Sequence, residues 1–187
     1  MKATGIVRRM DELGRVVIPK EIRRTLRIRE GDPLEIFTDR DELMLKKYSP
    51  IATIEKFSES AAKSLAELSG KSAVVCDTDG VLFACGEGKR DFSGKTLSPE
   101  IDKLLKERKS YVASEADGGT LIPITVPGDT NFSAQIVVPV VSGGDCLGAV
   151  ALLYKEAGAR VEADAVKLVR LTAEILANQF EEIGLKQ

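Results

Sequence analysis

The sequence predicts an α+β protein of two parts, a small β-rich segment over residues 1–50 and a larger domain over residues 51–187. Three observations predict this class. Short apolar pieces separated by Gly, Pro and Asp turns fill the first segment. Helical periodicity opens and closes the second segment, with strand patterns and a strong hairpin signal between the two helices. Basic residues concentrate at the amino-terminal end, so the two parts also differ in charge.

The first segment begins with the pattern of two strands and a turn, followed by a short helix. Residues 5–10 and 16–18 are β-rich, and Leu13-Gly14-Arg15 supplies the turn between them. Pro19 is suited to the first turn of a helix because its φ angle is already fixed there. We therefore expect strand, turn, strand and helix in this order.

The rest of the first segment predicts a second hairpin. Ile22 and Leu26, four residues apart, give the preceding helix one apolar face. After it, the apolar pieces 34–36 and 43–45 flank the acidic turn 39–42. The segment thus contains four short strands and one short helix.

Arginine is concentrated in this first segment, which holds eight of the chain's 12 arginines. Residues 1–30 carry nine Lys and Arg against four Asp and Glu, a net charge of +5, whereas residues 31–50 carry −2 and residues 51–187 carry −5. Guanidinium groups present fixed forks of donors that match phosphate oxygens and the guanine edge. A solvated surface is the alternative, but the use of Arg over Lys, seven to two in residues 1–30, favours nucleic-acid binding.

Fifty residues with these elements bury too little apolar surface for comfortable stability alone. Segments of this size usually depend on disulfides, a metal or a partner chain. The segment contains no cysteine and no histidine. We therefore expect an obligate dimer with a shared core, which would also suit a pseudo-palindromic duplex.

The residues of this segment resemble the AbrB family of transition-state regulators, and most of all its sporulation regulators with a GAF-like carboxyl-terminal half. The resemblance runs without a gap through Met1–Arg9, Asp11–Pro19, Arg23–Leu26, Gly31-Asp32 and Lys46–Tyr48. It implies a swapped-hairpin β-barrel, in which two chains interleave their hairpins and bind double-stranded DNA as a dimer.

The resemblance also implies which residues contact DNA. The DNA-contacting arginines of the family match Arg8, Arg15, Arg23 and Arg24, and Arg9, Lys2 and Lys20 are expected as phosphate contacts. The function it implies is sequence-specific transcription regulation in sporulation.

The second segment alternates helical and strand patterns. They are a helix over 53–69, strands over 72–76 and 81–85, a helix over 99–109, strands over 111–114 and 121–126, a hairpin of 134–141 and 146–154, and a helix over 161–183. Gly70 ends the first helix, and Ser98 and Pro99 begin the second. This order fits one antiparallel sheet with flanking helices.

The first and last of these helices carry apolar stripes. The stripe residues are Ile54, Phe57, Ala61, Leu65 and Leu68, then Val161, Ala165, Leu168, Val169, Thr172, Leu176, Phe180 and Ile183. Such stripes fit either ordinary core packing or an oligomer seam. The family resemblance implies that both helices take part in a homotetramer.

The hairpin of residues 136–141 and 143–150 is similar to the final hairpin of GAF domains. This resemblance implies a sensory and oligomerisation domain with a small-molecule effector, and it names no ligand. We expect no cofactor, because no motif in the segment indicates one.

Several classes of chemistry are disfavoured by the composition. The chain has no histidine, which removes Ser-His-Asp sites and zinc–histidine centres. Its three cysteines have no CxxC spacing and indicate reduced thiols rather than a disulfide framework or metal site. The start has no secretory pattern, so we expect a cytoplasmic, nucleoid-associated protein that is not an enzyme.

Three alternatives stay open. The run 74–83, with Asp77 and Asp79, resembles the first motif of haloacid-dehalogenase phosphatases, although an immediate return strand would make it a hairpin turn. Cys76 and Cys85 would lie near each other across that hairpin and act as redox thiols, as in GAF-like methionine sulfoxide reductases, or fill the core. An antitoxin is a further alternative, since swapped-hairpin domains also occur there, but the long folded second half argues against it.

Overall fold

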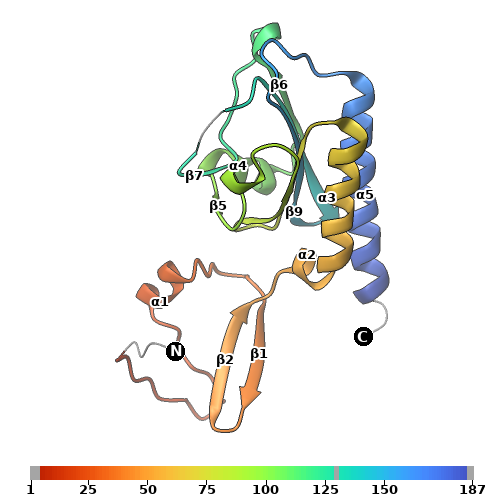
Figure 1. Ribbon diagram of the computed structural model, residues 1–187. Coiled ribbons are helices and arrows are strands. Elements are labelled where there is room, and N and C mark those ends of the chain that lie inside the picture. Colours follow the sequence, from red (N-terminus) through yellow and green to blue (C-terminus); the bar gives the residue numbers. More distant parts are fainter. Residues whose placement is uncertain (1–4, 129–130, 185–187) are drawn as a thin grey trace. The chain divides into compact units, whose positions relative to one another are not determined.

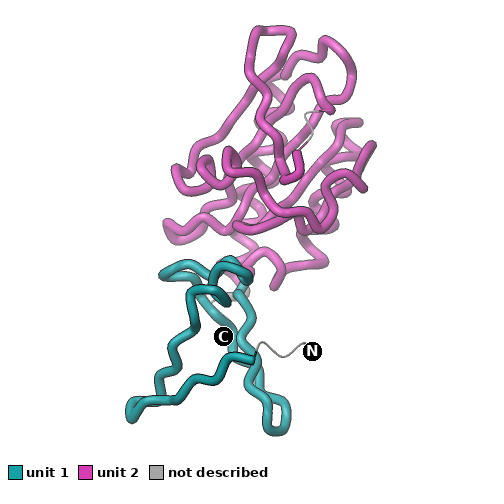
Figure 2. Tube along the Cα trace, turned by 90° about the vertical axis from the view of Figure 1, so that its left-hand side faces the viewer, with its two compact units in different colours: residues 1–48 teal, residues 49–187 magenta. Residues whose placement is uncertain are grey.

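The computed structural model describes residues 5–128 and 131–184 of the 187-residue chain. The chain divides into two compact units, residues 1–48 and residues 49–187, coloured separately in Figure 2. Ser49 and Pro50 belong to the second unit because they begin its first helix, where the Ser49 hydroxyl accepts a hydrogen bond from the Ala52 N–H at 3.3 Å. None of the described helices is long and apolar enough to cross a membrane.

The first unit contains one helix and one antiparallel hairpin. They are α1 (Lys20–Thr25), β1 (Leu34–Asp39) and β2 (Glu42–Lys47). Leu34 pairs with Lys47 and Asp39 with Glu42, so a two-residue turn with Arg40 at φ 49° joins the strands. The predicted second hairpin is confirmed, and its strands are longer than the apolar pieces that predicted them.

The predicted first pair of strands is wrong for the single chain. Residues 5–10 and 16–18 are not in strands, although the turn between them forms, with Gly14 at φ 76° donating its N–H to the Asp11 carbonyl. A β-rich segment becomes a strand only where another strand offers it a ladder of hydrogen bonds. Pro19 also lies one position earlier than predicted, as the N-cap of α1.

No described residue of the first unit is buried. Its large apolar side chains are exposed in a single chain, among them Val7, Leu13, Val17, Ile36 and Leu43. A unit without buried side chains has no core of its own.

The second unit is built on a five-stranded antiparallel sheet in the order β4-β3-β9-β8-β6. The strands are β3 (Ser72–Cys76), β4 (Val81–Cys85), β6 (Tyr111–Ser114), β8 (Ala134–Ser142) and β9 (Asp145–Tyr154). A separate two-stranded pair is formed by β5 (Thr96–Leu97) and β7 (Thr125–Val126), and the 3₁₀ turns are η1 (Lys89–Asp91) and η2 (Glu115–Asp117). The predicted strands 72–76, 81–85 and 111–114 are confirmed to the residue.

Helices cover the two faces of this sheet unequally (Figure 1). On one face lie α2 (Pro50–Thr53), α3 (Glu55–Ser69) and α5 (Ala163–Gly184), packed against a cluster that includes Ile136, Leu152 and Leu176. On the other face lies α4 (Pro99–Glu107), over a second cluster that includes Ile101 and Phe132. The result is a three-layer domain, and the predicted α+β class, an antiparallel sheet with flanking helices, is confirmed.

The predicted helix ends are confirmed in their chemistry. Gly70 adopts φ 65° as the C-cap of α3. The Ser98 hydroxyl accepts a hydrogen bond from the Ile101 N–H at 3.1 Å, and Pro99 is the first residue of α4. Helix α4 ends two residues earlier than predicted, because Arg108 turns to φ 53° and closes it.

The predicted strand over 121–126 is mostly wrong, since only Thr125–Val126 is a strand. The Ile122 N–H bonds to the side-chain oxygen of Gln135 at 2.7 Å, and Pro123 has no N–H to offer. This piece is therefore held by side-chain bonds rather than by a ladder. The predicted final hairpin is confirmed, with Gly143 and Gly144 forming its two-residue turn.

Candidate nucleic-acid interface

Helix α1 presents three of the candidate cations on six residues. Lys20, Arg23 and Arg24 are all exposed on it. The two arginines lie in its last turn, where cations are favoured by the negative end of the helix dipole. Arg27, at φ 54°, reverses the chain directly after the helix, and the Ile28 N–H returns to the Arg23 carbonyl at 2.8 Å. The helix is thus closed immediately behind its arginines.

Arg15 is positioned by a tight turn around Asp11. The Asp11 carboxylate accepts hydrogen bonds from the Leu13 and Arg15 N–H groups at 3.0 and 2.8 Å and from Arg15 Nε at 2.6 Å. These bonds lower the pKa of Asp11, first through the Arg15 backbone and then through its side chain. The Arg15 side chain remains 72% exposed, so its guanidinium is oriented and accessible.

The remaining candidates lie in the extended segment before this turn. Arg8 and Arg9 are exposed there, and Arg8 donates to the Val7 carbonyl at 3.3 Å. Lys2 lies outside the described residues. The structure therefore places the described candidates on three parts of one small unit and brings Lys20, Arg23 and Arg24 together on a single helix.

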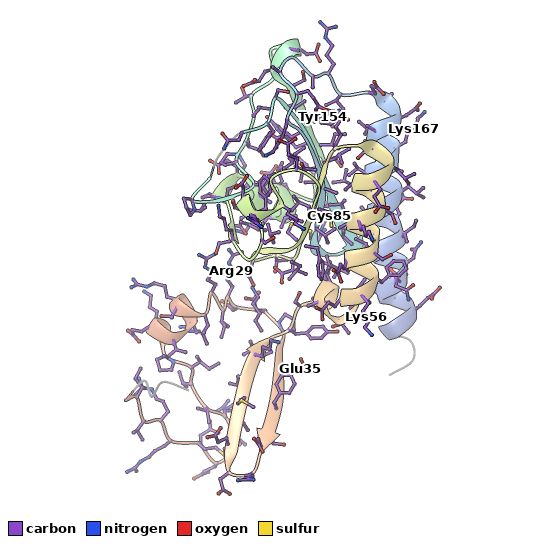
Figure 3. The ribbon with its side chains drawn as sticks, in the orientation of Figure 1. Arg29, Glu35, Lys56, Cys85, Tyr154 and Lys167 are labelled. Carbon is purple, nitrogen blue, oxygen red and sulfur yellow. The ribbon has the colours of Figure 1, made fainter. Side chains whose placement is uncertain are left out.

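Two further basic residues follow α1 and were missed as candidates. Arg27 and Arg29 are exposed, and Arg29, labelled in Figure 3, donates its backbone N–H to the Asp32 carboxylate at 2.7 Å. Asp32 also pairs with Lys47 at 3.0 Å, which links this loop to the end of β2. The signal that would have found them is the arginine-rich run itself, which continues to residue 29.

The aspartates of the second unit form a turn, as the hairpin interpretation requires. Asp77 Oδ1 accepts the backbone N–H groups of Asp79 and Gly80 at 2.8 and 2.9 Å, and β4 returns antiparallel beside β3. A phosphatase of the haloacid-dehalogenase type needs its aspartate at the end of a parallel strand followed by a helix. The observed sheet is antiparallel throughout its described strands.

The expected proximity of Cys76 and Cys85 is wrong. Cys76 pairs with Val81 and Cys85 with Ala73, so the two thiols stand at opposite ends of the hairpin. Their side chains also pack with different clusters on opposite faces of the sheet. Burial raises the pKa of Cys76 to about 12, which suits a core residue and not a redox thiol.

Comparison with known proteins identifies the chain over nearly its whole length. The family model described as stage V sporulation protein T C-terminal, transcription factor, matches residues 53–181. The stage V sporulation protein T of Bacillus subtilis (strain 168) is 45% identical over 184 residues, which cover 97% of this chain and 100% of that protein. The chain belongs to the stage V sporulation protein T family. The predicted resemblance to sporulation regulators is thereby confirmed.

The AbrB-like character of the first unit is supported by a second relative of the family. The transition state regulatory protein AbrB of Bacillus subtilis (strain 168) is 54% identical over 71 residues, 38% of this chain and 74% of that protein. A family model described as antidote-toxin recognition MazE, bacterial antitoxin, matches residues 7–53. The amino-terminal sequence is therefore similar both to this regulator and to an antitoxin family model.

Solved structures establish the fold of the second unit. The GAF domain of Thermosynechococcus elongatus PixJ matches with a TM-score of 0.59 at 12% identity, over 74% of this chain and 91% of that one. The GAF-B domain of DevS from Mycobacterium smegmatis matches with a TM-score of 0.55 at 12% identity, over 73% and 96%. The predicted GAF-like fold is confirmed, and at this identity the likeness concerns the fold alone.

Proposed function

We propose that this sporulation transcription factor binds double-stranded DNA through the exposed arginines of its first unit, as a dimer whose second units assemble it further and respond to a small molecule. The observation that carries the proposal is that seven arginines are exposed within residues 8–29. Arg8, Arg15, Arg23 and Arg24 are the proposed base and phosphate readers, with Arg9, Lys2 and Lys20 on phosphates. Arginine suits both tasks because its planar fork donates two parallel hydrogen bonds.

The proposed dimer explains why the first unit has no core in a single chain. Its exposed large apolar side chains are Ile6, Val7, Met10, Leu13, Val16, Val17, Leu26, Ile36, Phe37, Leu43, Met44 and Leu45. Soluble proteins rarely leave so many apolar groups exposed on so small a unit. Pairing residues 5–10 and 16–18 with strands of a partner chain would bury them and close the expected swapped-hairpin barrel. Dimerisation would also double the arginine set.

The proposed higher assembly uses an apolar face of the second unit, formed by Phe57 and Leu68 of α3 and by Leu171 and Ile175 of α5. Their exposed fractions are 38%, 75%, 53% and 42%. These four residues line one shallow groove of about 350 Å³ that runs along both helices. We infer that a second copy covers this α3–α5 apolar face and yields a tetramer.

The second unit supports a sensory role better than a catalytic one. Its two aspartates shape a turn, Cys76 is buried, and the proposed partner of the whole chain is DNA. As a DNA-binding regulator, the protein would act in the cytoplasm on the nucleoid. An antitoxin function is favoured only by the match over residues 7–53, whereas the family match spans residues 53–181.

The test of DNA binding is a fluorescence anisotropy titration of the full chain on a duplex selected from genomic fragments. Arg23→Ala and Arg24→Ala should each weaken binding by about 1–3 kcal/mol. Affinity should also fall steeply with salt, with a log–log slope of about −0.9 per phosphate neutralised. Arg90→Ala removes the same charge from an exposed position in the second unit and should leave the affinity unchanged. Unchanged affinity in both α1 variants, with folding intact, would refute the assignment.

A further inference from the structure

A cavity of about 620 Å³ opens at one edge of the sheet of the second unit. Its walls are the carboxyl-terminal half of α3, the start of β3, the end of β9, and the end of β4 with the loop that follows. The volume lies within the range of about 300–1,000 Å³ typical of small-molecule sites. On the opposite side of the sheet, the space beneath α4 is filled by a buried apolar cluster. The sheet-edge cavity therefore has the volume of a small-molecule site.

The floor of this sheet-edge cavity is held in place by close backbone contact. Gly86 adopts φ 94°, and a Cβ there would stand 2.8 Å from the Lys71 carbonyl oxygen, so its backbone lies directly against the start of β3. The Ser72 hydroxyl donates a hydrogen bond to the Glu87 carbonyl at 2.6 Å. The loop after β4 is thus fastened to β3 without any ligand, which lowers the cost of ordering the site on binding.

The inside of the cavity is apolar and its rim is charged. Ala66 and Cys85, which belong to the α3-side cluster, contribute apolar surface. The rim carries four lysines and four glutamates, namely Lys63, Lys71, Lys89, Lys155, Glu59, Glu67, Glu87 and Glu156. The rim therefore has no net charge, so it offers no excess of opposite charge to a simple anion or to a simple cation.

Some of these charges are already paired and set the shape of one side of the rim. Lys71 Nζ lies 2.5 Å from Glu156 Oε1 and 5.2 Å from the centre of the Tyr154 ring, while Lys155 Nζ lies 3.8 Å from Asp91. Tyr154 and Cys85 are labelled in Figure 3, where they mark this part of the domain. These pairs leave the other side of the rim to a ligand.

The other side of the rim carries both charges next to Cys85. Among the described residues, Glu59 and Lys89 form no ion pair, and Lys63 reaches only Glu67 at 3.8 Å, with both side chains about 70% exposed. Burial raises the pKa of Cys85, while Lys89 and Lys63 lower it and Glu59 and Glu67 raise it further. These groups therefore surround one point of the cavity with opposite charges.

We propose that the sheet-edge cavity binds a small zwitterion with an apolar side chain, of the free α-amino-acid class, as the effector of this regulator. The carboxylate would lie between Lys63 and Lys89, the ammonium group against Glu59, and the side chain on Ala66 and Cys85. The assignment rests on the sensory part of the proposed function, and it names the chemistry and the site of that signal.

The thiol of Cys85 offers a local measurement of occupancy in the full chain. Alkylation by iodoacetamide is followed at each cysteine by mass spectrometry, with the standard amino acids added one at a time. A bound amino acid should slow alkylation of Cys85 by about tenfold or more at saturation. Cys146 is half-buried and packs with the α4-side cluster, so its rate should not change. The amine that lacks the carboxylate of the protecting amino acid, and the carboxylic acid that lacks its ammonium group, should each protect Cys85 far less.

Variants of the rim separate the site from other causes of protection. Lys63→Gln and Glu59→Gln each remove one charge from an exposed position of α3 and should weaken protection about tenfold, the value of one charge-assisted hydrogen bond. Lys56→Gln and Glu55→Gln make the same changes earlier on α3, outside the cavity, and should leave protection intact.

The outcomes distinguish the site from the regulation. Protection of Cys85 by no amino acid, or equal protection in the four variants, overturns the proposed site while DNA binding through α1 can still stand. Protection of Cys85 that weakens in the Lys63 and Glu59 variants, and not in the Lys56 and Glu55 variants, supports the site. If the same amino acid then also shifts DNA affinity, binding is coupled to regulation, as reciprocity between two sites requires. An unchanged DNA affinity would leave the site in place and refute its role as effector site.

Discussion

Replacing Leu171 by Glu tests the assembly of the second units most directly. The exposed fractions of Phe57, Leu68, Leu171 and Ile175 together amount to about two fully exposed apolar side chains per protomer. At about 1.5–3 kcal/mol per side chain, their burial would contribute about 3–6 kcal/mol per protomer. Counted for both protomers, about 6–12 kcal/mol is set against an association cost of about 4–15 kcal/mol, and on this ground we propose the α3–α5 apolar face as the seam.

The cost of the substitution follows from the same numbers. Leu171 exposes 53% of its surface, so its loss removes about 1 kcal/mol of burial, and a buried unpaired carboxylate costs about 1–3 kcal/mol more. Because the proposed seam is two-fold, the substitution occurs twice in it and its free-energy cost is doubled. The total of at least about 4 kcal/mol weakens association about a thousandfold.

The assay is light scattering of the full chain over a dilution series, with circular dichroism to confirm the fold. Leu171→Glu should lower the mass from that of a tetramer to that of a dimer. Arg170→Glu is the matched control, because Arg170 is exposed on the side of α5 that faces β8. The reasoning is refuted if Leu171→Glu keeps the mass and dilution behaviour of the unmodified chain, or if Arg170→Glu dissociates it equally.

Three other predictions concern single positions. Gly148→Ala should lower the free energy of unfolding of the second unit by about 3 kcal/mol in urea, because a Cβ there would clash with the Cys76 carbonyl and Ile51 Cδ1. Gly158→Ala is the control. Its Cβ meets no atom within 4 Å, so it should cost only about 1–2 kcal/mol for the φ angle of 72°. Cys76 should resist alkylation in the folded chain even at pH 9, since its pKa is about 12, and ready labelling there would contradict its burial. Asp11→Asn should keep the turn and raise DNA affinity at low salt, because it removes one negative charge. Asp11→Ala should lose the turn and weaken DNA binding. Equal DNA affinities of the two variants would exclude a role for the turn.

The strands of the five-stranded sheet could be predicted because they are mostly apolar runs between turn residues. Both faces of the sheet are covered, so Ser72–Cys76 is buried at all five positions and stands out from its polar flanks. The strand structure of the first unit could not be predicted in this way. Residues 5–10 have the composition of a strand, but the single chain supplies no neighbour to pair with them.

The apolar stripe of α3 was predicted only in part, for a reason that concerns residue size. Phe57 and Leu68 fit the periodicity but are exposed, whereas Ser58, Ala62 and Ala66 are buried against the sheet. Small residues let a helix approach a sheet closely, and a hydrophobicity pattern gives them little weight. Phe57 and Leu68 therefore lie on the outward face of α3, whereas Leu65 of the same stripe is buried. Among the DNA-contact candidates, the sequence could name the arginines and the turn at Arg15, whereas the Asp11 hydrogen bonds that orient Arg15 are seen only in the structure.

The buried position of Ile51 has a consequence for how the protein assembles. Ile51 is wholly inside the core of the second unit, three residues after the first unit ends at Tyr48. Three residues span at most about 10 Å of chain. The first unit is therefore joined to the second by a short segment. In the proposed tetramer, joining two second units would raise the effective concentration of their first units for one another. The pairing of first units would then depend less on protein concentration than it would for the first unit alone.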